Sequence, residues 1–362
     1  MIIDCTDKKY EVFFGMIQLE ITGKCNMSCD HCRAWKEPNN HMTLEVVEKI
    51  LDFAVPEAES DIRFTISGGE PLLHPQFLDI LRLIKKKIIQ YGKRLDHAVI
   101  TTNGSLLTPE IIKGIEDLDF GEMFLQVSVD SFNAEQHDKF RHFPGSFKKA
   151  INALKMVSSS KLIPLMRTSI TSKDAMDDFA AIEKIIKLAG ESGVKKISFG
   201  PVIPTGKAQL NQDIILKPLE KKAFIEKLLA LRSKYPGISI STEDPVKFSI
   251  CPKEWDFGEF DYAACDFVGG CSAGINNVNI FSNGIITPCS MLHEPIVNVT
   301  DKSPDEILKA YTSSDIIKNL VERNVKGKCG SCEFKRLCGG CRAAAHGITG
   351  DYLAEDQTCW LG

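Results

Sequence analysis

The chain of 362 residues has a formal net charge of −4 and is 43% hydrophobic and 25% charged, an ordinary composition for a soluble protein. This mildly acidic balance gives no broad attraction to nucleic acid or to an anionic membrane surface. The N-terminus lacks the apolar run of a signal peptide, and no run approaches the roughly 18 apolar residues of a membrane span. We therefore expect a cytoplasmic protein with one large domain and an appendage, or with two domains.

From residue 15 to about residue 201, short β-branched strands alternate with amphipathic segments. Helices are expected at 43–54, with Thr43 as N-cap, and at 108–118, with Thr108 as N-cap and Pro109 at the first helical position. Repeated βα units favour a parallel sheet whose site lies at the carboxyl ends of the strands. Six units are too few for a complete eight-fold barrel, so an open barrel or a doubly wound sheet is expected. The expected strands are 15–21, 62–67, 97–102, 123–129, 163–170 and 194–200.

A helical pattern follows at 218–235, and the last hundred residues are rich in cysteine and glycine with short strands. The "SNG" within "NNVNIFSNGIITPC" predicts a hairpin turn.

The 13 cysteines are distributed unevenly, with none between residues 33 and 250. Because the cytosol is reducing, clustered cysteines there usually bind metal rather than form disulfides. The distribution therefore predicts two metal-bearing regions.

The first cysteine group is "CNMSCDHC", which follows the first expected strand and contains Cys25, Cys29 and Cys32. A zinc site needs a fourth ligand, and His31 is an awkward one because it is adjacent to Cys32. A 4Fe–4S cluster fits the spacing better, since three thiolates hold three irons and leave the fourth open to an exchangeable ligand. On spacing alone, zinc and buried structural thiols remain alternatives.

This Cys-x3-Cys-x2-Cys spacing resembles the motif of radical S-adenosylmethionine (SAM) enzymes. Further segments occur in the order expected for that family: "SGGEP" (67–71), "TTNG" (101–104), "VSVD" (127–130) and "HDKFRHFPGSF" (137–147). Taken singly, "GGEP" could be a plain turn, and Arg141 could form a surface ion pair. The resemblance implies that SAM is contacted by Ser67, Gly68, Gly69, Glu70, Thr102, Asn103, Ser128, Arg141 and His31.

The resemblance also implies a mechanism. SAM binds the open iron, one electron cleaves its S–C5′ bond, and the resulting 5′-deoxyadenosyl radical removes a hydrogen atom from the substrate. A ferredoxin or flavodoxin is the expected electron donor.

The C-terminal cysteines resemble the SPASM extension, which carries two auxiliary iron–sulfur clusters, although two zinc sites would also use eight thiolates. One departure is "CGGC", which has two intervening residues where many relatives have three, and this weakens the assignment of Cys341. The resemblance assigns Cys265, Cys271, Cys289 and Cys341 to a nearer cluster, and Cys329, Cys332, Cys338 and Cys359 to a farther one.

The resemblance implies an α/β fold, with a partial (β/α)6 radical SAM barrel followed by a small cysteine-rich α+β SPASM domain. The expected segments are a short extension (1–15), the barrel (16–216), a helical bridging segment (217–260) and the SPASM domain (261–362). Two cysteines, Cys5 and Cys251, remain unassigned and could be plain small hydrophobes. Cys251 is the one candidate for a thiol near the substrate, and no other catalytic residue is predicted.

SPASM proteins mainly modify peptides, so the expected activity is radical maturation of a peptide by crosslinking, thioether formation or epimerisation. Only about 15 residues precede the first strand, so a separate leader-binding protein is a possible partner. The alternative is a small-molecule enzyme such as a tetrapyrrole propionate decarboxylase, for which Arg33, Lys36, Arg141 and Arg167 are candidate carboxylate ligands. Sulfatase maturation is less favoured, because those enzymes place an aspartate where this chain has Ser290. A non-enzymatic cluster carrier is disfavoured by the intact set of SAM contacts.

Overall fold

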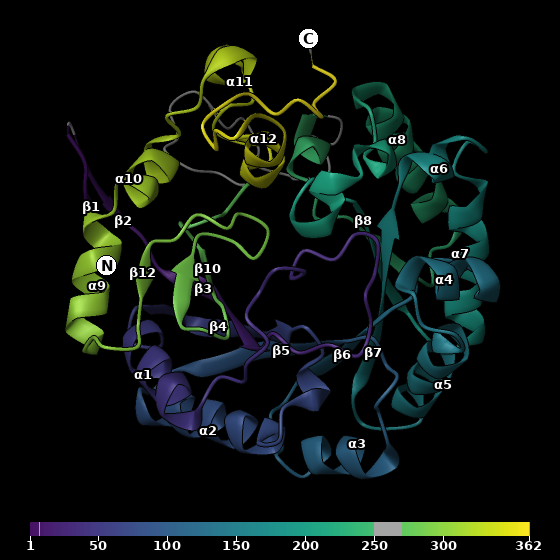
Figure 1. Ribbon diagram of the computed structural model, residues 1–362, viewed down its shortest axis with the longest axis horizontal. Helices are drawn as coiled ribbons and strands as arrows, with labels where there is room; N and C mark the ends of the chain where they lie inside the picture. The colour runs from purple at the N-terminus through teal and green to yellow at the C-terminus, as the bar shows by residue number, and fades with distance from the viewer. Residues whose placement is uncertain (7, 250–269, 362) are drawn as a thin grey trace.

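The computed structural model describes residues 1–6, 8–249 and 270–361, in which a curved sheet is surrounded by helices (Figure 1). The sheet has ten strands in the order β12-β11-β10-β3-β4-β5-β6-β7-β8-β9. All neighbouring pairs from β10 through β3 to β9 are parallel, whereas β11 and β12 are antiparallel additions at one edge. The strands are β3 (Phe14–Thr22), β4 (Ala58–Gly68), β5 (Arg94–Thr102), β6 (Met123–Ser128), β7 (Ile163–Ile170), β8 (Lys196–Pro201), β9 (Ser239–Ser241), β10 (Asn277–Ile280), β11 (Ile285–Thr287) and β12 (Val297–Asn298).

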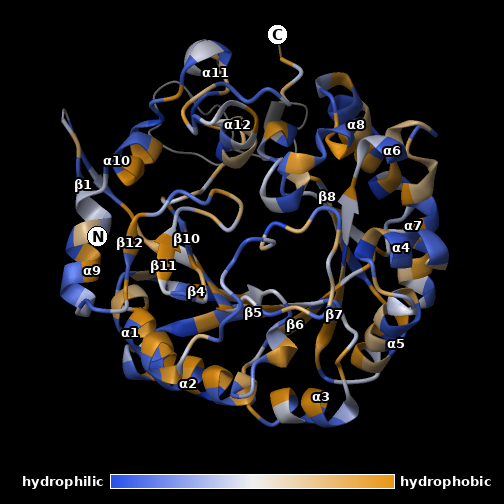
Figure 2. Ribbon diagram, viewed as in Figure 1, coloured by the Kyte–Doolittle hydropathy of each residue, from blue (hydrophilic) through white to orange (hydrophobic). Residues whose placement is uncertain are grey.

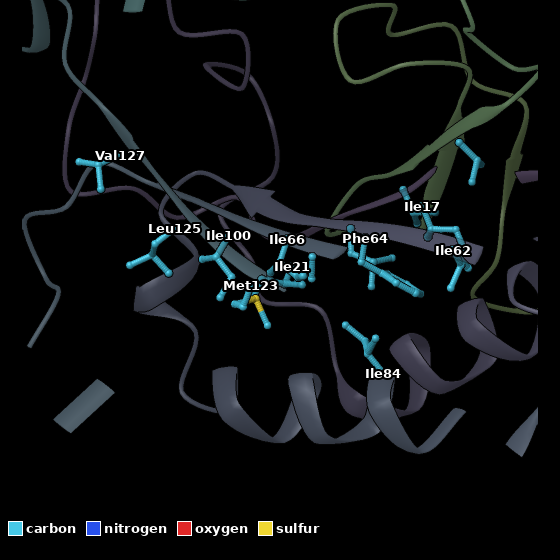
Figure 3. Close-up of a cluster of buried hydrophobic side chains, with 14 of the residues drawn as sticks. Ile17, Ile21, Ile62, Phe64, Ile66, Ile84, Ile100, Met123, Leu125 and Val127 are labelled. Carbon is cyan, nitrogen blue, oxygen red and sulfur yellow. The ribbon is translucent and has the colours of Figure 1, made fainter. Parts of the chain in front are cut away.

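The two faces of the sheet differ in polarity because they face different surroundings. Along β4, the side chains of Ile62, Phe64 and Ile66 are buried on the outer face, and Thr65 and Ser67 alternate with them on the inner face. Figure 3 shows the apolar side chains of several strands pointing towards the helix that carries Ile84. Parallel strands covered on both faces are usually apolar throughout, so this alternation indicates that the inner face borders a polar cavity.

Helices cover the outer face, and in Figure 2 several of them are striped with hydrophobic and hydrophilic residues, as expected for one buried side. Thr43 and Thr108 cap their helices by accepting hydrogen bonds from the backbone N–H groups of Val46 and Ile111, as predicted. The helices of this layer are α1 (Leu44–Ala54), α2 (Phe77–Gln90), α3 (Pro109–Glu116), α4 (Ala134–Arg141), α5 (Ser146–Ser158), α6 (Ser172–Ala175), α7 (Ala180–Glu191) and α8 (Pro218–Lys234).

The α/β fold and all six expected strands are confirmed as β3 to β8, and the "SNG" turn joins β10 to β11. The sheet is wider than the six predicted units. It gains the short strand β9 at one edge, while β10 from the cysteine-rich region pairs with β3 at the other. The three residues of β9 are too few for a periodic signal, and the pairing of β10 with β3 joins segments more than 250 residues apart, which no local pattern predicts.

Short helices follow β12 in the C-terminal region and lead from the side of the sheet next to β12 to the top of the view in Figure 1. They are α9 (Pro304–Ser313), α10 (Asp315–Glu322), α11 (Gly327–Ser331) and α12 (Arg342–Thr349). A small hairpin of β1 (Ile2–Asp4) and β2 (Lys9–Glu11) contacts α9 and α10 through β1. In the described part of the chain, no helix has the length and apolar character needed to span a bilayer.

Candidate functional site

A cavity of about 780 Å³ occupies the concave inner side of the sheet. Inward-facing residues of β3 to β8 form its wall, including Gln18, Thr65, Thr101, Gln126 and Arg167. Its other walls come from segments that follow the strands and from the cysteine-rich region. The volume lies within the usual range for small-molecule sites, about 300–1,000 Å³.

The loop after β3 brings Cys25, Cys29 and Cys32 to this cavity. Its backbone is fixed to the end of α4, since the Asp30 N–H donates to the Phe140 carbonyl at 3.0 Å. Burial raises the pKa of all three thiols, that of Cys29 to about 12. Bare thiolates are therefore disfavoured here, and a bound metal group would supply the positive charge that stabilises them. The thiols fit such a group.

The "SGGEP" segment at the end of β4 packs directly against the cysteine loop. The N–H groups of Gly69 and Glu70 donate to the carbonyls of Thr22 and Lys24 at 2.7 and 2.8 Å. A Cβ atom at Gly68 or Gly69 would lie 2.2 Å from one of these two oxygens, and Gly68 has a φ of +130°. Gly68 and Gly69 line the cavity, and the close approach that requires a glycine at each position is to the backbone oxygens of Thr22 and Lys24.

Glu70 is fully buried and does not line the cavity, unlike the other eight predicted SAM contacts. Its carboxylate accepts hydrogen bonds from the Thr102 hydroxyl and the Asn103 N–H, both at 2.7 Å, and from the Leu72 N–H at 3.2 Å. Burial raises its pKa, although these donors partly offset the effect. Glu70 therefore ties the ends of β4 and β5 together.

Asn103 extends this network to the cysteine loop. Its side-chain amide donates to the Asn26 oxygen at 2.9 Å, and the Asn26 amide donates to the Ser105 hydroxyl at 2.8 Å. Asn26, inside "CNMSC", was not predicted as a site residue. Its hydrogen bonds to Asn103 and Ser105 indicate its part in holding the loop.

Ser128 at the end of β6 and Arg141 at the end of α4 both line the cavity. Arg141 is held by Asp130, whose Oδ2 lies 2.7 Å from Nη2 and 2.8 Å from Nε. Burial alone would raise the pKa of Asp130, but the Arg141 guanidinium holds it well below its ordinary value. The predictions missed Asp130, although the last letter of "VSVD" marked a carboxylate at a strand end.

His31 also lines the cavity, and its ring stacks on Phe140 with centroids 4.7 Å apart and planes 4° from parallel. Its buried Nδ1 has no hydrogen-bond partner among the residues that the structure describes. An unpaired buried nitrogen at a cavity wall fits a role in contacting a bound group. Within the described ranges, no three His, Cys, Asp or Glu side chains are arranged to hold a single metal ion, as a zinc site would need.

The C-terminal cysteines fall into two groups by position. Cys271, Cys289 and Cys341 line the same cavity as the first cysteine loop. Cys265 and Cys251 lie outside the described residues. The remaining four do not line the cavity, and their neighbours include backbone N–H groups that donate to sulfur, such as Gly340 to Cys338 at 3.3 Å. This group comprises Cys329, Cys332, Cys338 and Cys359.

Cys5 is buried near Glu322, remote from the cavity-lining residues, and burial raises its pKa. Its burial is consistent with the prediction that Cys5 is a plain small hydrophobe.

The basic side chains that were candidate carboxylate ligands differ in how far contacts within the protein already engage them. Arg33 forms a salt bridge of 2.6 Å with buried Glu20 and reaches the Ser290 carbonyl at 3.4 Å. Lys36 lies over the Trp35 ring, and neither residue lines the cavity. Arg167 lines the cavity and donates to the Ser198 hydroxyl at 2.6 Å.

Arg167 has only a loose carboxylate contact, 3.8 Å to Glu243, whose side chain is 78% exposed. Its charge is therefore less fully compensated than those of Arg33 and Arg141.

Comparison with known proteins identifies the class. Residues 19–172 match the family model of the radical SAM superfamily, so the protein contains a radical SAM domain and is a radical SAM enzyme. The chain is 28% identical over 356 residues to an AdoMet-dependent heme synthase of Methanosarcina barkeri (strain Fusaro / DSM 804), with 95% of each chain covered.

Further relatives include a second heme synthase and a bacteriocin biosynthesis protein. One is the AdoMet-dependent heme synthase of Nitratidesulfovibrio vulgaris Hildenborough, 24% identical, with 95% of this chain and 91% of the relative covered. Another is the subtilosin biosynthesis protein AlbA of Bacillus subtilis (strain 168), 23% identical, with 89% of this chain and 66% of the relative covered. Among solved structures, Streptococcus suis SuiB bound to its precursor peptide SuiA matches with a TM-score of 0.73 and 16% identity, covering 97% of this chain and 76% of SuiB. The fold is that of SPASM-type radical SAM enzymes.

Proposed function

We propose that this radical SAM enzyme acts on a small tetrapyrrole-type substrate and oxidatively decarboxylates a propionate side chain. The observation that carries the proposal is the end-to-end similarity to heme synthases, which extends over 95% of both chains for the Methanosarcina relative. This was the alternative in the sequence analysis, and it now replaces peptide maturation as the preferred function.

The residues of the cysteine loop and of the strand ends have distinct parts in this proposal. Cys25, Cys29 and Cys32 would hold a 4Fe–4S cluster, with SAM beside it against Gly68, Ser128 and Arg141. When bound, this cofactor pair supplies a 5′-deoxyadenosyl radical that takes a hydrogen atom from the substrate. Asp130 orients Arg141, and the hydrogen bonds of Glu70 and Asn103 hold the cysteine loop against β4 and β5.

Arg167 is the basic side chain with the strongest case for binding a substrate carboxylate. It reaches the cavity from β7, and Glu243, which it contacts loosely, lines the same cavity. A guanidinium binds a carboxylate through two parallel hydrogen bonds, and Arg167 has less carboxylate contact than Arg33 or Arg141.

The proposed reaction requires an electron acceptor. A propionate, –CH2–CH2–COO⁻, that loses one hydrogen atom and one electron becomes a vinyl group and releases CO2. Auxiliary iron–sulfur clusters, which the C-terminal cysteines would hold, would supply such an acceptor, since Cys271, Cys289 and Cys341 line the substrate cavity. These clusters, and the cysteine ligation inferred from the sequence, belong to the proposal.

Peptide modification is the second candidate. It is supported by the similarity to AlbA and by the shared fold with peptide-bound SuiB, although the fold alone carries no substrate assignment. A peptide substrate would require the cavity to admit one side chain while the backbone lay outside.

The test is anaerobic incubation of the iron- and sulfide-reconstituted protein with SAM, reductant and an iron tetrapyrrole that carries propionates. We expect a product lighter by one CO2 and two hydrogen atoms per propionate, formed together with 5′-deoxyadenosine. The Arg167→Met variant should retain SAM cleavage but lose most tetrapyrrole binding. Formation of 5′-deoxyadenosine without any tetrapyrrole mass change would count against the proposal, and modification of a peptide offered in parallel would favour the second candidate.

A further inference from the structure

Two arginines are completely enclosed in the C-terminal cysteine-rich region. Arg323 and Arg342 are 2% and 1% exposed and rank among the largest fully buried side chains of the described chain. A buried guanidinium is unfavourable unless hydrogen bonds and an opposite charge compensate it.

The hydrogen bonds of Arg342 go mainly to neutral groups. Its guanidinium donates to the backbone carbonyls of Ala354 and Tyr352 at 2.6 and 2.9 Å. Within residues 1–6, 8–249 and 270–361, no carboxylate forms an ion pair with it. Its one potentially anionic contact is the sulfur of Cys329, 3.9 Å from Nη2.

Arg323 has neighbours in both cysteine groups. Its side chain hydrogen-bonds that of Cys271, and Cys338 is also among its electrostatic neighbours. The backbone ties these two cysteines together, because the Cys271 N–H donates to the Cys338 carbonyl at 2.9 Å.

The two glycines of the "CGGC" sequence pack closely against these two arginine side chains. A Cβ atom at Gly339 would lie 2.2 Å from Nη1 of Arg323, and one at Gly340 would lie 2.5 Å from Nη2 of Arg342. Both glycines also have positive φ, +71° and +64°. Any other residue would collide with a guanidinium and strain the backbone, so the short loop and the arginines require each other.

We propose that Arg323 and Arg342 are positioning residues that raise the reduction potentials of the two auxiliary clusters, with Arg342 acting beside Cys329 and Arg323 beside Cys271 and Cys338. The inference rests on the auxiliary clusters of the proposed function. A cluster with four thiolate ligands is anionic and becomes more so on reduction, so a fixed cation beside its sulfur stabilises the reduced state. The low dielectric of a buried site strengthens this effect.

The two positive charges should shift both reduction potentials in the same direction, upwards. With both arginines in place, each cluster accepts an electron more readily than the same cluster would beside a neutral side chain. An acceptor for an electron leaving a substrate radical needs this property.

The experiment is an EPR-monitored redox titration of the reconstituted protein and its variants. Arg342→Gln and Arg323→Gln remove the charge and keep a donor, whereas Arg342→Lys and Arg323→Lys keep the charge. We expect each Gln variant to lower the potential of one cluster signal by about 59 mV, a tenfold change in a one-electron equilibrium, and each Lys variant to stay near the parent. Arg63→Met is the control, because Arg63 donates to the Gly15 carbonyl and contacts Asn276, away from the cysteines.

The outcomes separate this inference from the proposed function. A parent protein with about four irons per chain instead of about twelve would show that the auxiliary clusters themselves are absent. With about twelve irons, unchanged potentials in the Gln variants would overturn the inference alone, as would equal shifts in the Lys and Gln variants, which indicate packing rather than charge. If a Gln variant fails to retain its cluster while the matching Lys variant retains it, the requirement for charge is supported.

Discussion

The barrel and the last forty residues are stabilised in different ways. The outer face of β3 to β7 and its helices form one extensive cluster of buried Ile, Leu, Val and Phe side chains. No buried member of this cluster comes from residues 322–361, where large buried side chains include Arg342 and Arg323. The barrel therefore supports its hydrogen-bonded cysteine loop on an extensive apolar core, whereas the C-terminal segment buries more charge and sulfur and less apolar surface.

The sharpest test of this contrast is Cys29→Ala in the barrel loop. SAM cleavage should fall to background, because two thiolates cannot hold the cluster with one open iron, while the thermal unfolding temperature should change little. Anaerobic formation of 5′-deoxyadenosine and circular dichroism measure the two effects. Cys5→Ala, which removes a thiol far from the cavity, is the control and should retain activity. Sustained cleavage by Cys29→Ala would contradict the assignment.

Removal of iron should affect the two regions unequally. Anaerobic chelation is expected to raise deuterium uptake throughout residues 322–361, because little apolar surface is buried there to offset the cost of burying Arg323 and Arg342. Peptides from β4, β5 and β6 should exchange as slowly as before. Hydrogen exchange with mass spectrometry measures both, and uniform protection after chelation would show that the C-terminal region folds without metal.

Within the barrel, Asp130→Asn should be the most costly charge removal. It leaves the Arg141 guanidinium buried without its partner, which typically costs about 3–5 kcal/mol, and it should weaken SAM binding as well. Guanidinium chloride unfolding and equilibrium dialysis with SAM measure the two effects. Asp79→Asn breaks the exposed Asp79–Arg82 pair of 2.6 Å and should cost less than about 1 kcal/mol. Equal effects of the two substitutions would remove the assigned role of Asp130.

The smallest expected effect is a pH dependence caused by His137, which is 1% exposed. Burial lowers its pKa to about 4, and its Nδ1 accepts a hydrogen bond from the Asp130 N–H at 3.1 Å. Below its ordinary pKa of about 6.5 the unfolded chain binds the proton first, so stability falls as the pH drops from 6.5 towards 4. Between pH 6.5 and 5 this amounts to about 2 kcal/mol.

His137→Asn keeps an acceptor for the Asp130 N–H and cannot titrate in this range. The unfolding free energies of the parent and this variant are measured at pH 7 and at pH 5. The parent should lose more stability than the variant between these two pH values. A constant difference would mean that His137 does not titrate as described.

The sequence predicted the elements whose signals are local. Capping by Thr43 and Thr108, the six barrel strands and the hairpin turn all depend on neighbouring residues, and all are present. The pairing of β10 with β3 joins segments more than 250 residues apart, and no local pattern carries that information.

The candidate site shows the same division. Its cysteines and strand-end motifs could be read from spacing, whereas Asp130, Asn26 and the two buried arginines act through contacts that only the folded chain brings together. Arg342 directly follows a cysteine in "CGGCR", but the sequence did not indicate that its side chain turns inward.

The parallel pairing of β10 with β3 has a practical consequence for anyone who dissects this protein. A fragment ending before β10 would leave the backbone N–H and C=O groups along one side of β3 without partners, and such a bare strand edge invites self-association. Chimeras between relatives should therefore exchange β10 together with β3, preserving the alignment of Asn277 with Met16, rather than exchange the cysteine-rich tail as an independent module.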